Sequence, residues 1–423
     1  MKIAAVVLFI AMYALMIILP EKRRPWIACG VALIFLILGI LPWGDLASVI
    51  DWNILLMIFG TVVIVDYFIQ SKMPNLLADR LLDLAPNVMW VTILMSLFAG
   101  IVSAFIDNVA TVYMIAPVGL AICKKLKISP VPMIISIAVS SNLQGAATLV
   151  GDTTSIMLAG AAHMDFNDFF WFQGRPGVFF AVEVGALLTI PIMLFLFRKE
   201  KKPVSADEYT KVTDYIPTIA MVGHIVCLIG ASFFKNKPEI TNGMICLIWG
   251  IGCIIAELVK TGDKDTMIMN LKNVDYQTIF LLAGLFAVIG GITNMGIIDD
   301  ISKFIIRAGG NNYFLLYTIV VWGSVLISAF IDNIPYVATM LPVIGAVAGS
   351  LGVEPYLLYY GLLIGATLGG NITPIGASAN IAGTGLLRRE GYEVSFGQFM
   401  RIGLPFTLAA VTGGYISLWL FWR

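Results

Sequence analysis

The sequence has few charged residues and almost no histidine. Of its 423 residues, 12% are Asp, Glu, Lys or Arg and two are His, whereas 59% are apolar, and the mean hydropathy is +0.92. A soluble domain carries about a quarter charged residues, so this composition excludes an ordinary soluble enzyme and a disordered protein. The 26 basic residues only balance the 26 acidic ones, so we expect no nucleic-acid partner. The composition predicts an all-α polytopic membrane protein.

Cysteine is also scarce. The five cysteines fall singly inside apolar runs, without the CxxC or His-containing spacing of a metal site. This pattern excludes a disulfide scaffold and indicates buried apolar side chains. We expect no metal centre and no cofactor beyond a bound Na⁺ or coupled protons.

Long apolar runs dominate the chain. A membrane-spanning helix needs about 20 apolar residues. We expect ten spans, at residues 2–19, 26–43, 53–70, 133–162, 177–197, 215–234, 240–259, 276–295, 356–387 and 402–422. Two further apolar stretches, 88–123 and 313–348, are each interrupted by an Asp-Asn pair. If both stretches turn back on themselves, most basic residues fall on one membrane face, as the positive-inside rule requires. We therefore expect two re-entrant hairpins.

The two interrupted stretches belong to an internal repeat. The hexapeptide Ser-Ala-Phe-Ile-Asp-Asn occurs at 103–108 and again at 328–333, and the same offset relates further pairs: Pro117 and Pro342, Gly145 and Gly370, Thr148 and Thr373, Gly151 and Gly376. Such fixed-period similarity indicates a duplicated unit. Each unit holds five spans and one hairpin, and an odd number of spans inverts the second copy, a recurring plan of transporters.

The repeat sets the expected domain boundaries. The first inverted repeat is residues 1–202, with its hairpin at about 88–124 and a broken helix at about 131–162. A cytoplasmic linker follows at 203–214. The second repeat is residues 215–423, with its hairpin at about 313–349 and a broken helix at about 356–387.

Polar residues gather where the apolar pattern is interrupted. Irregular backbone at membrane depth is found only where protein or a water-filled cavity satisfies it, and an ionisable group there is a functional candidate. We expect a substrate- or ion-binding site made of residues at the hairpin tips and helix breaks: Asp107, Asn108, Thr111, Asn142, Gly145, Thr148, Gly151, Asp152, Asp332, Asn333, Gly370, Asn371, Thr373, Gly376, Ser378 and Asn380.

The aspartates among these residues have two interpretations. Asp107 and Asp332 occupy equivalent tips and are candidate proton carriers, but each could also cap the helix that follows it. Asp152 has no acidic counterpart, because Ala377 stands at the equivalent position. It is either an asymmetric ion ligand or another cap.

These motifs resemble a known superfamily. Ser-Ala-Phe-Ile-Asp-Asn with Pro117, then Gly-Ala-Ala-Thr-x-x-Gly-Asp ending at Asp152, and Gly-Gly-Asn-x-Thr-x-Ile-Gly-Ala-Ser-Ala-Asn ending at Asn380 are similar to the ion transporter superfamily. The likeness is strongest to arsenite permeases (ArsB), NhaD-type sodium–proton antiporters and the melanosomal P protein. It implies a homodimer with elevator-like movement of a transport domain. An ATPase subunit is a further expected partner if the substrate is arsenite.

The resemblance points to a secondary active transporter in the cell membrane rather than an enzyme. We expect it to move a small inorganic or organic anion or an arsenite-like oxyacid, coupled to protons. The alternatives are a sodium–proton antiporter and a sodium-coupled dicarboxylate or divalent-anion symporter. Related symporters carry Ser-Asn-Thr at the hairpin tips, and the Asp-Asn pairs of this chain depart from that pattern. A passive channel also remains open from the sequence.

Overall fold

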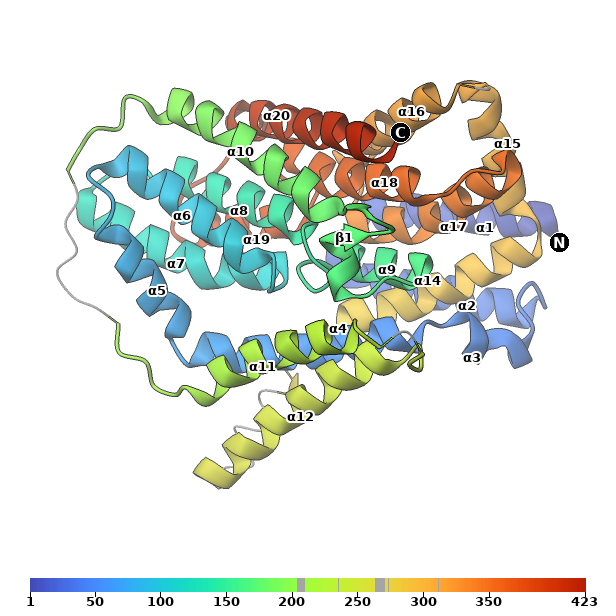
Figure 1. Ribbon diagram of the computed structural model, residues 1–423, viewed down its shortest axis with the longest axis horizontal. Coiled ribbons are helices and arrows are strands. Elements are labelled where there is room, and N and C mark those ends of the chain that lie inside the picture. Colours follow the sequence, from blue (N-terminus) through green and yellow to red (C-terminus); the bar gives the residue numbers. More distant parts are fainter. Residues whose placement is uncertain (204–209, 235, 263–270, 273, 311) are drawn as a thin grey trace.

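The computed structural model describes residues 1–203, 210–234, 236–262, 271–272, 274–310 and 312–423 (Figure 1). Residues 204–209 of the expected linker lie outside the described residues. The described chain contains nineteen α-helices and one small antiparallel sheet. This all-helical architecture confirms the predicted class.

The helices divide at the linker into two series. The first series is α1 (Lys2–Ile18), α2 (Arg24–Ile37), α3 (Leu46–Val49), α4 (Trp52–Gln70), α5 (Met73–Leu82), α6 (Val88–Ser103), α7 (Asn108–Leu126), α8 (Val131–Gly145), α9 (Thr153–Ala162) and α10 (Val178–Phe197). The second is α11 (Ile216–Ala231), α12 (Thr241–Thr261), α14 (Tyr276–Asn294), α15 (Ile297–Gly309), α16 (Tyr313–Ser328), α17 (Asn333–Leu351), α18 (Tyr356–Gly369), α19 (Ser378–Arg389) and α20 (Phe396–Trp422).

Short elements connect these helices. Four 3₁₀ turns are η1 (Glu21–Arg23), η2 (Trp43–Asp45), η3 (Phe166–Phe169) and η4 (Gly370–Ile372). Strands β1 (Trp171–Phe172) and β2 (Arg175–Pro176) form the antiparallel hairpin, with Trp171 opposite Pro176. Its turn residues Gln173 and Gly174 both have positive φ, as a two-residue hairpin turn requires.

Seven of the described helices are long and apolar enough to cross a membrane, and an eighth span results if α15 and α16 count as one bent pair. The protein is therefore a multi-pass membrane protein. The span expected at 26–43 is shorter, because α2 ends at Ile37 and Gly39 follows it with φ +70°. Only glycine adopts that conformation without strain, so the helix stops there.

Both interrupted stretches fold as helical hairpins. In the second, α16 runs parallel to α18, since Gly361 packs on Tyr317 and Gly369 packs on Val325. The chain then turns back, and Tyr336 of α17 forms a 3.0 Å hydrogen bond with Ser324 of α16. We call α6–α7 the first hairpin and α16–α17 the second hairpin.

The first hairpin turns in the same way. Gly100 near the end of α6 packs on Ser140 and Gln144 of α8, whereas Gly119 of α7 packs on Met133 near the start of α8. The chain thus returns along α8 after the tip at residues 104–107. Each tip lies beside a broken helix, α8–α9 in the first half and α18–η4–α19 in the second.

Helices of the two halves pack in reciprocal pairs. At Gly60 of α4 a Cβ would meet the backbone of Cys246 in α12, and at Gly284 of α14 a Cβ would meet the backbone of Ala28 in α2. Glycine allows these close approaches. Helices α10 and α20 also cross directly, with Gly185 against the carbonyl of Ala410.

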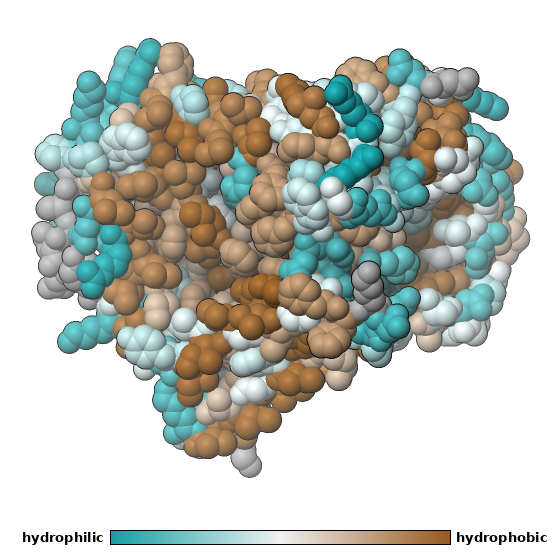
Figure 2. Space-filling model, viewed as in Figure 1, coloured by the Kyte–Doolittle hydropathy of each residue, from teal (hydrophilic) through white to brown (hydrophobic). Residues whose placement is uncertain are grey.

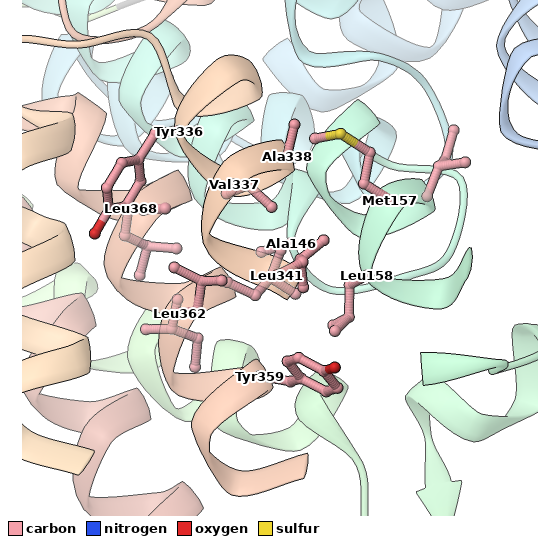
Figure 3. Close-up of a cluster of buried hydrophobic side chains, with 14 of the residues drawn as sticks. Ala146, Met157, Leu158, Tyr336, Val337, Ala338, Leu341, Tyr359, Leu362 and Leu368 are labelled. Carbon is pink, nitrogen blue, oxygen red and sulfur yellow. The ribbon is translucent and has the colours of Figure 1, made fainter. Parts of the chain in front are cut away.

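Buried apolar residues form two clusters, and the larger one includes the contact between the second hairpin, α18 and the end of the first broken helix. Figure 3 shows Met157 of α9 beside Ala338 of α17, and Leu158 facing Leu341 of α17 and Tyr359 of α18, all at most 7% exposed. The outer surface is apolar over large areas, especially along α12, one end of which projects beyond the other helices (Figures 1 and 2). Such a surface is what a lipid environment requires.

Candidate functional site

The two hairpin tips are built alike. Asp107 accepts hydrogen bonds from the backbone N–H groups of Val109 and Ala110, at 3.0 and 3.1 Å, and so caps α7. Asp332 caps α17 by accepting from the N–H of Ile334 at 3.1 Å. The capping interpretation of both aspartates therefore holds, and it leaves one oxygen of each carboxylate for other partners.

The broken helices hold the tips in place. The hydroxyl of Thr148 donates to the carbonyl of Ala104 at the first tip, and that of Thr373 donates to Ala329 at the second. Gly151 packs against the carbonyls of residues 103 and 104, and Gly376 packs against those of residues 328 and 329. Residues related by the internal repeat thus make equivalent contacts in the two halves.

Further hydrogen bonds support the loops of the broken helices and the first tip. Asn380 donates to the carbonyls of Gly370 and Thr373, each at 3.0 Å, and closes the loop of the second broken helix. In the first broken helix, Ser155 donates to the carbonyl of Gly145 at 3.1 Å. Thr111 is fully buried and its hydroxyl faces the carbonyl of Ile106 at 3.4 Å.

Asp152 differs from the tip aspartates. It occupies the N-cap position of α9, but its side chain makes no cap hydrogen bond. Its carboxylate instead accepts from the hydroxyl of Thr154 at 2.8 Å and from the amide of Asn333 at 3.2 Å. Asn333 belongs to the second hairpin, so Asp152 links the two halves beside the second tip.

An amide network joins the halves behind the tips. Asn142 accepts from Asn108 at 2.8 Å and donates to the carbonyl of Thr367 at 2.6 Å and to Asn371 at 3.1 Å. Asn371 in turn donates to the carbonyl of Val139 at 2.8 Å. Asn142, Thr367 and Asn371 are fully buried, so each bond matters to stability because no water replaces it.

Arg24 is a site residue that the sequence did not reveal. The charge distribution of the sequence only assigns Arg24, with most other basic residues, to one membrane face, yet Arg24 is only 14% exposed and its Nη1 lies 2.9 Å from Oδ2 of Asp332. The same carboxylate oxygen accepts from Ser378 at 3.0 Å. No local signal marks Arg24, since its partner lies 308 positions further along the chain.

A cavity of about 830 Å³ opens over this arrangement. Six of the predicted site residues line it: Asp107, Asn108, Asp152, Asp332, Asn333 and Ser378. The remaining ten lie outside its lining: Thr111, Asn142, Gly145, Thr148, Gly151, Gly370, Asn371, Thr373, Gly376 and Asn380. The structure thus brings together the side chains at the tips, while most residues of the helix breaks form the support behind them.

The cavity lining is rich in acid. Besides Asp107, Asp152 and Asp332 it includes Asp66 and Asp275, against the two cationic residues Arg24 and Lys272. The carboxylates of Asp107 and Asp332 both act electrostatically on Asp152. Among the described residues, however, no three acidic, His or Cys side chains converge closely enough to hold a metal ion.

Glu183 contacts the first broken helix away from the cavity. It lies on α10, with its carboxylate near the side chain of Gln144 at the end of α8. A polar neighbour on another helix is expected for such a side chain inside a membrane protein.

The chain matches known transporters over most of its length. A family model described as citrate transporter, CitMHS, matches residues 13–365. An uncharacterized transporter of Mycobacterium tuberculosis is 29% identical over 99% of this chain and 98% of its own. The human P protein is 24% identical over 87% of this chain and 53% of its own. The sequence resemblance to a group that includes the P protein is thereby confirmed.

Two solved structures share the fold. The YdaH transporter of Alcanivorax borkumensis superposes with a TM-score of 0.64 at 14% identity, covering 89% of this chain and 86% of its own. MtrF of Neisseria gonorrhoeae, from a class of antimetabolite efflux pumps, gives 0.56 at 15% identity, covering 92% and 84%.

Proposed function

The chain belongs to the citrate transporter (CitMHS) family and is a secondary transporter, and we propose that it moves a small carboxylate or oxyacid together with protons. The carboxylates of Asp107, Asp152 and Asp332, gathered at one cavity, carry this proposal. An anion alone would be repelled by them, whereas an anion that enters with protons or cations would not. The cavity volume of about 830 Å³ suits a small organic ligand.

The inverted repeat is part of the proposal. In an assembly with two-fold symmetry, contacts are reciprocal and equivalent residues meet on the axis. The pairing of α4 with α12 and of α14 with α2 has this reciprocity. The repeat offset also relates Asn142 to Thr367, and this pair is in contact. These contacts support a pseudo-two-fold axis between the halves.

The position of the cavity suggests which face is open. Arg24, Asp66 and Lys272 line it, and the charge distribution of the sequence assigns all three to the cytoplasmic side. We therefore interpret the structure as an inward-open state. Transport would proceed by movement of the hairpins and broken helices as one body against the other helices, in a homodimer.

The excess of acidic over cationic side chains in the cavity lining also supports one alternative function. Five aspartates against two cationic residues would suit a sodium–proton antiporter, in which the carboxylates exchange the two cations and no anion is carried. A sodium-coupled anion symporter would need Na⁺ in place of the proton. The coupling ion is therefore the main variable of the test.

The experiment is a flux assay in inverted membrane vesicles without ATP. Radiolabelled citrate, succinate and arsenite, and separately ²²Na⁺, are supplied against an imposed pH gradient. We expect saturable, gradient-driven uptake of at least one anion or oxyacid. Sodium-dependent proton movement without any such uptake would identify the antiporter instead, and non-saturable flux would indicate a channel.

Asp152→Asn tests the site. The change keeps the shape of the side chain and removes its charge, so the fold should persist, while coupled uptake should fall at least about tenfold because a charged hydrogen-bond acceptor is lost. The control is Asp299→Asn, on the exposed face of α15, which should leave uptake unchanged. Normal uptake by Asp152→Asn would contradict the assignment.

A further inference from the structure

An ion pair on the outer face joins the first broken helix to the loop between α11 and α12. Oδ2 of Asp165, which follows the end of α9, lies 2.6 Å from Nζ of Lys237, and its Oδ1 accepts from the amide of Asn242 at 3.2 Å. Asp165 and Lys237 are only 25% and 16% exposed, and Asn242 is buried. The charge distribution of the sequence assigns Lys237 to the outer side, away from the mouth of the cavity. We call Asp165, Lys237 and Asn242 the outer latch.

A tight helix contact precedes the outer latch in the chain. At Gly160 of α9, a Cβ would lie 2.7 Å from Oδ2 of Asp51 and 2.9 Å from Cδ1 of Ile54. Asp51 is the N-cap of α4 and accepts from the N–H of Ile54 at 3.1 Å. The broken helix thus packs directly on the start of α4. Both neighbouring atoms are the ends of flexible side chains, so a small side chain in place of the glycine fits after a slight adjustment.

The second half has the equivalent residues without the contact. Within one position, the repeat relates Gly160 to Gly385 of α19, and it relates the two α4 residues to Asp275 and Thr278 of α14. Asp275 caps α14 by accepting from the N–H of Thr278 at 3.1 Å, as its counterpart caps α4. A Cβ at Gly385 would nevertheless meet nothing within 4 Å, and Asp275 and Thr278 line the cavity. The contact that is closed on the outer side is therefore open on the side of the cavity.

From this asymmetry, and resting on the proposed function, we propose that the outer latch holds the carrier in the inward-open state, and that its release lets α19 pack on the start of α14 and close the cavity. In an inverted-repeat carrier, one body rocks against the other around a fixed site, so the two sides close in turn. Helix α9 then leaves α4 when α19 reaches α14. Gly160 and Gly385 mark the equivalent contacts of the two states.

The outer latch carries a charge that its counterpart in the second half lacks. Asp165 is the N-cap of η3 in a capping box with Asp168, and Ser395 is the N-cap of α20 in a capping box with Gln398. Each N-cap precedes a Phe-x-x-Phe motif, so Ser395 is the counterpart of Asp165. Closure of the cavity therefore gains no ion pair from Ser395, whereas the outer latch stabilises the inward-open state alone. An interaction made in one of two states shifts the population toward that state.

Two cysteine pairs report the two states. A disulfide brings its two Cβ atoms to about 3.8 Å, closer than any atom to a Cβ at Gly385 in this structure, so Thr278→Cys with Gly385→Cys, the inner pair, reports the closed cavity. Ile54→Cys with Gly160→Cys, the outer pair, is in contact here and reports the inward-open state. Both are oxidised with copper phenanthroline in membranes without substrate, and the disulfides are measured by mass spectrometry. Single-cysteine variants control for the native cysteines.

The latch variants remove one charge each. Lys237→Gln and Asp165→Asn should each raise the oxidation rate of the inner pair at least about tenfold, the range for loss of a hydrogen bond between charged groups. Asparagine still serves as an N-cap, so η3 should keep its structure. Lys237→Arg keeps the charge and should stay near the wild-type rate. Arg307→Gln is the matched control, because Arg307 is exposed on α15 and the charge distribution assigns it to the same side.

The outcomes are distinct. Unchanged oxidation of the inner pair in both Lys237→Gln and Asp165→Asn, with the outer pair still oxidised, would overturn the role of the outer latch and leave the proposed function intact. A transporting protein whose inner pair oxidises in none of the variants would overturn the closing contact. A wild type that moves none of the anions or oxyacids would overturn the proposed function, while faster oxidation of the inner pair in the two latch variants would still support the latch.

Discussion

Gly376 offers a sharp test of how the second hairpin tip is held. A Cβ at this position would lie 2.6 Å from the carbonyl oxygen of Gly370 and 2.8 Å from those of Ser328 and Ala329. Ordinary contacts of a Cβ begin near 3.4 Å. All three neighbours are backbone atoms, so no side chain can rotate away. Relief requires the tip that carries Asp332 to move relative to the broken helix.

The cost of Gly376→Ala follows from this geometry. Overpacking a dense interior costs about 1–3 kcal/mol, and three backbone overlaps place this substitution at the upper end. Because the displaced tip also carries Asp332, we expect both a lower thermal unfolding temperature in detergent and a loss of uptake. The measurement is thermal survival of the size-exclusion peak, together with substrate flux in vesicles.

Gly385→Ala is the matched control. Gly385 lies in α19, where a Cβ meets nothing within 4 Å. Alanine is favoured over glycine within a helix by up to about 1 kcal/mol, so this variant should be as stable as the wild type or more so. If Gly376→Ala behaved like Gly385→Ala in both measurements, the close packing of the tip on the broken helix would be refuted.

Two other substitutions probe the support behind the cavity. Thr148→Val and Thr373→Val each remove a hydroxyl that donates to a tip carbonyl, so each should lower the free energy of unfolding by about 1–3 kcal/mol through an unsatisfied buried carbonyl. Because the two threonines are equivalent in the repeat, we expect both variants to lose the same thermal stability. A loss in only one of the two variants would show that the two tips are held differently. Asn142→Leu deprives Asn108, Asn371 and the carbonyl of Thr367 of a partner. It should cost several kcal/mol and abolish the monodisperse size-exclusion peak, whereas a stable Asn142→Leu protein would contradict the network.

The sequence predicts the breaks in the helices better than the contacts between them. The Asp-Asn pairs and the Gly- and Thr-containing motifs mark local interruptions of an apolar pattern, and the structure has helix ends there, at residues 103–108 and 328–333. The internal repeat strengthens the prediction of helix breaks, because a wrong interpretation of a motif in one half would have to apply to the equivalent motif in the other half as well. Helix capping is itself a local property, so it was foreseeable for Asp107 and Asp332.

Long-range partners were not foreseeable in the same way. The carboxylate of Asp152 could have capped α9, and only the position of Asn333 shows that it bonds across the halves instead. In the sequence, Arg24 is one basic residue among several that mark a membrane face. Its burial depends on how α1 and α2 pack against the second hairpin, and no spacing within the chain encodes that arrangement.

The amide of Asn142 has a consequence for how the protein is made. Its carbonyl oxygen finds Asn108 within the first half, but its N–H group donates only to residues of the second half, Thr367 and Asn371. During synthesis the first half emerges before these acceptors exist. The side-chain N–H group of Asn142 therefore has no acceptor at membrane depth until more than 220 further residues have been translated. The native state of the first half is completed by the second, so a chain truncated at the linker should be a substrate for quality control rather than a stable half-transporter.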